Sequence, residues 1–430
     1  MSYTPTAKIA VPKIAVPKIA VIGAGITGIT TAYELLDRGF DVTVFDRNRY
    51  AAMETSFANG GQLSASNAEV WTQWSTILKG LKWMMKSDAP LLVNPRPTWH
   101  KIRWMAEFLS NIPNYRANTV ETVRLAIAAR AVLYEMAERE GIEFGLERRG
   151  ILHFYECARD LAHARKVNEM LAEGGLERRE VSPEEIREIE PALQGDLIGG
   201  FLTPSDASGD IHAFTTGLAR ACARRGADLR MGTNVTRLQK TPDGVLVTTD
   251  GLRHPFDGVV VAAGIHSREF ARQLGDRVNV YPVKGYSVTI ALEDAESRAA
   301  APWISLLDDK AKIVASRLGE GRFRIAGTAE FNGANRDIRA DRIRPLTDWC
   351  ERHFPDISTE TVTPWAGLRP MMPSMLPRVG RGAAKGVFYN TGHGHLGWTL
   401  SAATARMVAE TVAQQIPLSG QGAHRLPRAA

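Results

Sequence analysis

Cysteine is scarce in this sequence, and its three cysteines are far apart. Cys157, Cys222 and Cys350 stand outside any C-x-x-C spacing, which argues against a disulfide framework and against a zinc site. We therefore expect no bound metal. Such sparse cysteine usage fits a reducing compartment, and we expect a cytoplasmic protein.

Long apolar runs and long basic runs are lacking as well. No segment approaches the roughly 18 consecutive apolar residues of a membrane span, and the N-terminal residues lack the apolar core of a signal peptide. The net charge of +6 is spread along the chain, which argues against a dedicated nucleic-acid binder. A mild attraction to anionic lipid or to acidic partners remains open.

What is present is an ordinary globular composition in a long chain. The sequence has 430 residues, of which 44% are hydrophobic and 23% are charged, and these values give no sign of disorder. Single hydrophobic cores stop growing at about 250–300 residues. The chain is therefore expected to fold as two domains.

Segment 18–46 begins with the pattern of a dinucleotide-binding unit. The apolar run Ile19–Ile22 predicts a buried parallel strand, because it is short, continuous and followed at once by glycine. Gly23, Gly25 and Gly28 have the spacing G-x-G-x-x-G, which allows a tight turn, a close approach of the backbone to a pyrophosphate, and close packing of the next helix.

The residues after this turn complete the unit. A helix with one apolar face follows and is expected to end at Gly39, and the next strand brings Asp46 to its C-terminal end. A carboxylate there accepts hydrogen bonds from ribose hydroxyls and repels a 2′-phosphate. The sequence thus predicts a dinucleotide site, with FAD and NAD both open at this point and a structural glycine turn as the alternative.

Two further segments are rich in small and polar residues. Residues 54–64, ETSFANGGQLS, can bring backbone close to a flat ring with polar edges, although an ordinary Gly/Asn turn has the same composition. Residues 391–399, TGHGHLGWT, form a second glycine turn at the start of the last helix, which suits an anionic or electron-rich ligand. Two such turns at opposite ends of the chain imply a discontinuous cofactor domain.

The middle of the chain is predicted to contain both helices and strands. Helices are expected over 119–140, 159–173 and 211–226 and from Ser182, with a strand over 151–155. Strands at 227–231, around Val235, Val245 and Val247, and at 259–264 are expected to return to the first sheet. A second strand-rich block runs from Tyr281 to residue 327.

Two N-terminal features remain without an assigned role. Residues 74–86 predict a basic amphipathic helix with tryptophan, and such a helix either packs in the substrate domain or lies on an anionic membrane surface. The pentad KIAVP occurs at 8–12 and again at 13–17. Proline cannot donate to a sheet ladder, so both copies are expected to be a frayed or edge-lying extension.

Five stretches together resemble the FAD-dependent D-amino-acid dehydrogenases, relatives of D-amino-acid oxidase and glycine oxidase. These stretches are the glycine fingerprint with Asp46, ETSFANGGQLS, YPVKGYS, WAGLRPMMP with the later LPRVGR, and NTGHGHLGWT. The likeness covers nearly the whole chain from Lys18 to the last helix. It implies FAD rather than NAD as the cofactor.

The resemblance also assigns the cofactor residues. It implies that the 54–64 loop and the 392–399 turn hold the flavin ring, and that Val235 offers backbone contacts to the adenine end. The residues expected to bind FAD are Gly23, Gly25, Ile26, Thr27, Gly28, Asp46, Arg47, Thr55, Ser56, Asn59, Gly60, Gly61, Gln62, Leu63, Val235, Ala263, Gly264, Gly392, Gly394, His395, Leu396, Gly397, Trp398 and Thr399.

The same resemblance assigns a substrate site. Arg369, in Gly-Leu-Arg-Pro, matches the arginine that binds the substrate carboxylate, and a guanidinium fork suits that planar anion; a structural salt bridge is the alternative. Tyr281 and Tyr286 are expected to close the pocket, against ordinary strand packing. His393 and His395 are expected either to handle a proton or to fix the turn.

The implied reaction is oxidative deamination of D-amino or D-imino acids. Arg369 clamps the carboxylate, a backbone carbonyl near Gly394–His395 receives the amine, and the Cα hydrogen leaves as hydride to flavin N5. The resulting imine hydrolyses to a 2-oxo acid and ammonia, or remains as a cyclic imine. Electrons are expected to pass to a quinone or another acceptor, with the 74–86 helix as a contact with the membrane at its inner face.

The expected fold is α/β, with a discontinuous Rossmann-like FAD-binding domain and an α+β substrate domain whose sheet is mostly antiparallel. The predicted segments are 18–70, 195–275 and 365–420 for the FAD-binding domain, 71–194 and 276–364 for the substrate domain, and 1–17 for an N-terminal extension.

Two other functions stay open at this point. One is a flavin oxidase of glycine, sarcosine or another secondary amine that hands its electrons to oxygen. The other is a dinucleotide-binding regulatory or scaffold protein without turnover, against which Arg369 beside a second glycine turn argues.

Overall fold

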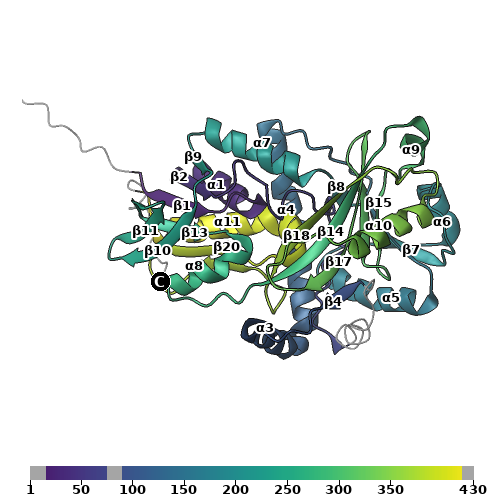
Figure 1. Cartoon of the computed structure of the whole chain (residues 1–430), viewed down its shortest axis with the longest axis horizontal. Helices are drawn as coiled ribbons and strands as arrows, with labels where there is room; N and C mark the ends of the chain where they lie inside the picture. Colours follow the sequence, from purple (N-terminus) through teal and green to yellow (C-terminus); the bar gives the residue numbers. More distant parts are fainter. Residues whose placement is uncertain (1–15, 75–89, 419–430) are drawn as a thin grey trace, which may run out of the picture.

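The chain folds around two β-sheets that lie side by side (Figure 1). This computed structural model describes residues 16–74 and 90–418. The predicted helix over 74–86 and the KIAVP repeats at 8–17 lie outside the described residues, apart from Trp74, Val16 and Pro17.

The first sheet draws its strands from three separate regions of the chain. In spatial order they are β19 (Arg378–Arg381), β20 (Val387–Thr391), β13 (Gly258–Val261), β1 (Lys18–Ile22), β2 (Asp41–Asp46) and β9 (Asp228–Met231). All neighbours are parallel except β19 and β20, which are antiparallel. This arrangement is the predicted discontinuous, Rossmann-like sheet.

Side chains of β1 alternate between two cores because successive residues of a strand point to opposite faces. Ile19 and Val21 pack against the helices on one face, and Ala20 and Ile22 contribute to the core on the other face. The helices of the first face are α1 (Ile26–Asp37), α4 (Tyr115–Glu140), α7 (Ile211–Arg224) and α11 (Gly397–Gln415).

The other face of this sheet is covered by a structure that the sequence did not predict. β10 (Val235–Thr241), β11 (Gly244–Thr249) and β12 (Leu252–Phe256) form a separate antiparallel meander, which packs there with α8 (Ser267–Gln273). The expectation that the strands around Val235, Val245 and Val247 join the first sheet was therefore wrong. Their apolar residues do face that sheet, and pattern alone does not distinguish packing on a sheet from pairing within it.

The second sheet is mostly antiparallel, as predicted. In spatial order its strands are β18 (Val362–Met371), β14 (Tyr281–Ala291), β17 (Arg322–Phe331), β16 (Ile313–Arg317), β15 (Ser305–Asp308), β5 (Ile151–Tyr155), β7 (Gly199–Thr203) and β6 (Arg179–Val181), and β4 (Leu91–Val93) pairs with β17. The parallel pairs are β5 with β15 and β4 with β17.

Two strands of the second sheet come from segments predicted for the FAD-binding domain. β7 lies after residue 195 and β18 begins before residue 365, yet both pair with strands of the second sheet. The sheets therefore divide the chain at other points than these two predicted limits. Strand pairing is a long-range contact, and the local sequence of a strand does not determine which other strand it pairs with.

The remaining elements surround these sheets. They are β3 (Gln62–Leu63) paired with β8 (Ala207–Ser208), the helices α3 (Trp99–Ser110), α5 (Ala158–Glu173), α6 (Pro183–Ile189), α9 (Ala295–Ala300) and α10 (Ala340–His353), and the 3₁₀ turns η1 (Ile112–Asn114), η2 (Gly264–His266) and η3 (Gly394–Leu396). Two predicted helix ends are confirmed. Gly141 caps α4 at φ 63°, and Ser182 and Glu185 form a capping box at the start of α6.

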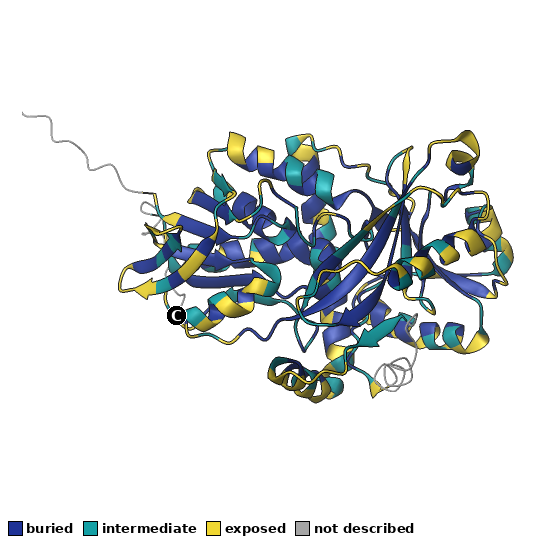
Figure 2. Ribbon diagram, viewed as in Figure 1, coloured by how far each residue is buried: buried dark blue, intermediate teal, exposed yellow. Residues whose placement is uncertain are grey.

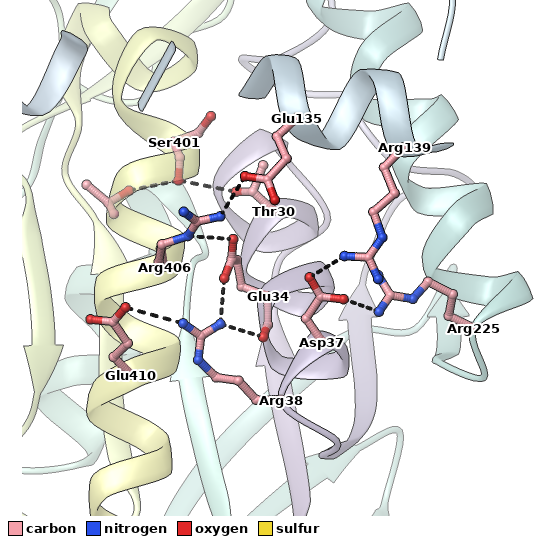
Figure 3. A network of polar contacts seen from close by, with 11 residues as sticks. Thr30, Glu34, Asp37, Arg38, Glu135, Arg139, Arg225, Ser401, Arg406 and Glu410 are labelled. Atoms are coloured by element: carbon pink, nitrogen blue, oxygen red, sulfur yellow. Dashed lines mark hydrogen bonds and ion pairs between the residues drawn. The ribbon is translucent and has the colours of Figure 1, made fainter. Parts of the chain in front are cut away.

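The first and last helices of the described chain are joined by buried polar contacts (Figure 3). Glu34 of α1 is only 2% exposed and accepts hydrogen bonds from Arg38 and from Arg406 of α11. Arg406 also reaches Glu135 of α4. One buried carboxylate thus joins helices α1 and α11.

The distribution of buried residues matches this arrangement of two sheets and surrounding helices. Figure 2 shows that the central strands of both sheets are buried, whereas exposed residues gather on the outer sides of the helices. Within residues 16–74 and 90–418, no helix is both long and apolar enough to cross a membrane.

Candidate active site

A cavity of about 540 Å³ lies where the two sheets meet. Its wall is formed by the turn between β1 and α1, the 54–64 loop, strands β14, β16, β17 and β18, and the turn before α11. The two glycine turns from opposite ends of the sequence therefore face one space.

The turn after β1 is shaped by contacts of its own backbone. Gly23 has φ +109°, and a Cβ atom on Gly28 would lie 1.8 Å from the carbonyl oxygen of Gly23. Gly25 precedes α1 with φ −73° and leaves the helix N-terminus open to the cavity. The Asp46 carboxylate accepts a hydrogen bond from Ala24 N at 2.7 Å, so the acid at the end of β2 is fixed beside this turn.

The 54–64 loop is held by side chains and backbone of the second sheet. Ser287 of β14 donates to the carbonyl of Ala58 at 2.7 Å, and Ser316 of β16 donates to the carbonyl of Gly60 at 2.9 Å. From the loop itself, Thr55 donates to the carbonyl of Leu368 in β18 at 2.8 Å. The second sheet thus positions the 54–64 loop, although this loop follows the nucleotide-binding unit in the sequence.

The turn before α11 places two histidines at the cavity. His393 is buried and its Nε2 lies 2.9 Å from the hydroxyl of Thr404, and burial lowers the pKa of His393 to about 3. His395 stacks on Trp71 with ring centroids 4.9 Å apart. Burial, and then the nearby charge of Arg369, lowers the pKa of His395 to about 4. Both imidazoles are therefore neutral at pH 7.

Arg369 presents a cation at the cavity wall. Its Nη1 donates to the carbonyl of Thr328 in β17 at 2.8 Å, and its guanidinium lies over Gly285 of β14. No ion pair to Arg369 occurs within the described ranges, and burial alone lowers its pKa to about 10. A guanidinium in this setting has several unused donors and no compensating anion.

Comparison with known proteins defines the family. A family model described as FAD dependent oxidoreductase (DAO) matches residues 18–411. The chain belongs to this FAD-dependent oxidoreductase family. The match confirms the predicted family and identifies FAD as its cofactor.

Individual relatives of this FAD-dependent oxidoreductase agree with the family match. A D-amino acid dehydrogenase 3 of Mesorhizobium japonicum is 61% identical over 403 residues, covering 93% of this chain and 98% of the relative. A D-amino acid dehydrogenase of Paramagnetospirillum magneticum is 41% identical over 420 residues, covering 94% and 97%. The crystal structure of glycine oxidase from Geobacillus kaustophilus has the same fold, with a TM-score of 0.73 at 21% identity and coverage of 96% and 100%.

The cavity of this oxidoreductase has polar groups that suit the flavin of FAD. The residues Gln62 and Trp398 line the cavity, and their atoms Gln62 Oε1 and Trp398 Nε1 are buried with no hydrogen-bond partner among the described residues. One is an acceptor and the other a donor, and a buried polar atom without a partner is costly. A ring with donors and acceptors along its edge satisfies both.

The two tyrosines differ in where the structure places them. Tyr281 does not line the cavity; its ring stacks with Phe331, and its hydroxyl accepts a hydrogen bond from Gly333 N at 3.2 Å. Tyr286 contributes to the wall, but its hydroxyl donates to Glu330 at 2.7 Å. Neither hydroxyl is directed at the cavity, because strand β14 is buried on both faces and each phenol has a partner there.

Most of the other residues predicted for the cofactor and substrate line this one cavity. Besides Tyr281, the exceptions are Gly28, Gly61 and Leu63, which pack behind the wall. In their motifs these residues are next to residues that line the cavity. A motif match does not distinguish a residue that lines the cavity from one that packs behind it. The predicted site residues are thus assembled as a group, while their individual roles remain predictions.

Several wall residues were missed in the sequence. They are Asn67, Glu69, Trp71, His163, Asp309, Lys312 and Thr328. Trp71 lies just before the predicted 74–86 helix, and nothing in the sequence indicated its stack on His395. Thr328 continues an ordinary strand pattern, and only strand pairing brings it beside Arg369. Lys312 lies in the turn before β16. No group of three or more His, Cys, Asp or Glu side chains suited to a metal occurs in the part of the chain described.

Proposed function

We propose that this protein oxidises D-amino acids to 2-oxo acids and ammonia as an FAD-dependent dehydrogenase. The observation that carries the proposal is the guanidinium of Arg369, which lies at the cavity wall without a carboxylate partner among the described residues. The names of the relatives at 61% and 41% identity support the same substrate class.

Arg369 supplies recognition of the substrate carboxylate. A half-buried cation without an anion is unfavourable, and a planar carboxylate offers two oxygens to the guanidinium fork. Nη1 is already engaged by the carbonyl of Thr328, so this bond fixes the fork while Nη2 and Nε remain to bind the ligand. Binding of the amino acid then compensates the charge that folding left unpaired.

The C-terminal turn supplies the other end of the clamp. We assign a backbone carbonyl of Gly394 or His395 to the substrate amine, since this turn lines the cavity and its imidazoles are neutral. A neutral His395 adds no second positive charge beside Arg369. Bound FAD would supply the hydride acceptor, and the residues of this clamp would hold Cα in place for the transfer.

The test is anaerobic bleaching of the flavin absorbance by a panel of D-, L- and N-substituted amino acids. We expect D-amino acids to bleach the holoenzyme and their L-enantiomers to be at least about 100-fold less efficient, which corresponds to roughly 2.7 kcal/mol of discrimination. Bleaching by sarcosine or glycine with no response to larger D-amino acids would replace this proposal with the secondary-amine oxidase.

We further propose that the electrons leave to a quinone or another acceptor rather than to oxygen. The relatives that support this are named dehydrogenases. Under air, turnover is expected to reduce a quinone dye much faster than it forms hydrogen peroxide, and rapid stoichiometric peroxide would contradict the proposal.

Membrane contact through residues 74–86 lies outside the described residues and stays a prediction. Substitution of Lys79, Lys82 and Lys86 by alanine is expected to reduce binding to anionic vesicles. Unchanged partitioning of the variant would remove the prediction.

A further inference from the structure

Thr328 has a backbone conformation that is unusual for its residue type. Its φ is +57°, in the left-handed region that glycine favours and β-branched residues rarely adopt. The residue lies within β17 at an irregularity of pairing with β14, where Lys284 pairs with Glu330 but Tyr286 pairs with Gly327. Residues 328 and 329 therefore stand opposite Gly285 alone, which is the geometry of a β-bulge.

The strands around Thr328 hold it in this conformation. Ala329 N donates to the carbonyl of Pro90 at 2.7 Å, just before the parallel pairing of β4 with β17. On the other side, Gly327 pairs with Ile313 of β16. Strain of this kind persists only where the surroundings fix it, and it is concentrated at ligand sites.

The bulge gives the two oxygens of Thr328 different roles. Its carbonyl accepts the hydrogen bond from Arg369 Nη1 at 2.8 Å. Its hydroxyl Oγ1 is buried without a hydrogen-bond partner in the part of the chain described, in a residue that is 5% exposed and lines the cavity. One residue thus carries an unsatisfied hydroxyl and, through its carbonyl, anchors a guanidinium that has no ion-pair partner among the described residues.

The geometry points to Thr328 as a second substrate-binding residue, whose hydroxyl donates a hydrogen bond to the carboxylate that Arg369 holds. This inference rests on the proposed function, since it concerns the same substrate. A carboxylate bound to Arg369 beside this residue would supply the acceptor that the hydroxyl lacks.

The test measures binding of propionate to the holoenzyme through the change in visible flavin absorbance. Thr328→Val removes the hydroxyl and keeps the branched shape, and we expect it to weaken propionate binding by about 10- to 100-fold. Thr328→Ser restores a hydroxyl and is expected to recover most of the affinity. Thr363→Val, at an exposed position of β18, is the matched control and is expected to bind propionate as the wild type does.

Thr328→Gly separates binding from strain. Glycine adopts positive φ without cost, so we expect this variant to melt at the same or a higher temperature while binding propionate as weakly as Thr328→Val. A structural role alone would lower stability in both variants and leave the affinity of the folded fraction unchanged. With D-alanine, KM is expected to rise more than kcat falls.

The outcomes distinguish this inference from the function on which it rests. Propionate binding needs no turnover, so a flavin that D-amino acids fail to bleach overturns the proposed function alone. Wild-type affinity for propionate in Thr328→Val or Thr328→Gly, or equal loss in the valine and serine variants, overturns the role of the hydroxyl.

Discussion

A Cβ atom added to Gly285 would lie 2.3 Å from Cζ of Arg369. The guanidinium therefore lies flat over a glycine of the neighbouring strand, and Nη1 reaches past it to the carbonyl of Thr328. The absence of a side chain at residue 285 is what allows the cation to reach the cavity wall.

Substitution of this glycine is expected to displace the guanidinium. The overlap of Gly285→Ala involves the end of a flexible side chain, so we expect the arginine to move while the fold and the FAD content are retained. Loss of positioning then lowers kcat/KM for D-amino acids by roughly 10- to 100-fold. Gly321→Ala is the matched control, because nothing lies within 4 Å of its added Cβ. Equal activity of both variants would show that the position of the guanidinium does not matter.

Removal of the cation itself has opposite effects on activity and stability. Arg369→Leu is expected to lower kcat/KM by about 30-fold or more, because truncation of one partner of a desolvated charged pair costs about 2–5 kcal/mol. The free energy of unfolding in the absence of substrate is expected not to fall, since an uncompensated buried charge is removed. Arg369→Lys keeps the charge but not the fork, and it is expected to restore little activity.

Denaturant unfolding and steady-state kinetics of the same preparations check both effects. Arg381→Ala, at an exposed position of β19, provides the control for loss of a positive charge. Normal efficiency of Arg369→Leu toward amino acids would refute the assignment of the carboxylate site.

The glycines of the first turn are expected to separate folding from cofactor binding. A Cβ on Gly25 would meet Ser56 Oγ at an ordinary 3.4 Å, whereas a Cβ on Gly28 would meet Gly23 O at 1.8 Å. Gly25→Ala is therefore expected to fold normally and to bind FAD at least about tenfold more weakly, or roughly 1.4 kcal/mol. Gly28→Ala is expected to lose about 2 kcal/mol of stability through overpacking. Thermal unfolding of apoprotein and FAD titration distinguish the two, and the reverse assignment would contradict the expected roles.

The contact of Glu34 in α1 with Arg406 in α11 is expected to stabilise the cofactor domain. Glu34 is buried and bonded to both Arg38 and Arg406, so Glu34→Ala removes the one buried carboxylate that these two cations share and is expected to cost about 2–3 kcal/mol. Glu135→Ala, which removes an exposed partner of Arg406, is the control and is expected to cost less than about 1 kcal/mol. Chemical denaturation measures both losses, and similar values would show that burial of Glu34 is unimportant.

His393 is expected to make stability depend on acid pH. Its pKa is lowered to about 3 in the folded protein by burial, while an unfolded histidine has a pKa of about 6.5. Between these two pKa values the unfolded state binds more protons than the folded state. The contribution of His393 to the free energy of unfolding is therefore full above about pH 6.5 and falls as the pH falls towards 3. At pH 5 the loss is about 2 kcal/mol relative to pH 8.

The comparison of wild type with His393→Gln isolates this contribution. Glutamine can still bond to Thr404 but does not titrate, so the variant is expected to show a shallower decline of unfolding free energy between pH 8 and pH 5. Parallel pH profiles of the two proteins would mean that this imidazole does not titrate differently on folding.

The local sequence determined much of this protein. The strand before Gly23, the glycine spacing and the acid at residue 46 are short-range patterns whose physical requirements are met within a few residues, and they predicted the nucleotide turn. The capped ends of α4 and α6 followed for the same reason. The motif around Arg369 predicted a cation near the substrate, and the structure brings that cation to the cavity shared by both glycine turns.

Tertiary structure decided the rest, because it depends on which strand pairs with which. The strand containing Val235 has the pattern of a sheet strand but pairs in a separate meander. Tyr281 and Tyr286 share one motif, yet the pairing of β14 gives each hydroxyl a partner away from the cavity. The bulge at Thr328 arises from a mismatch between β14 and β17, two strands about 40 residues apart in sequence. Such a register is set by packing across the whole sheet, and no local pattern encodes it.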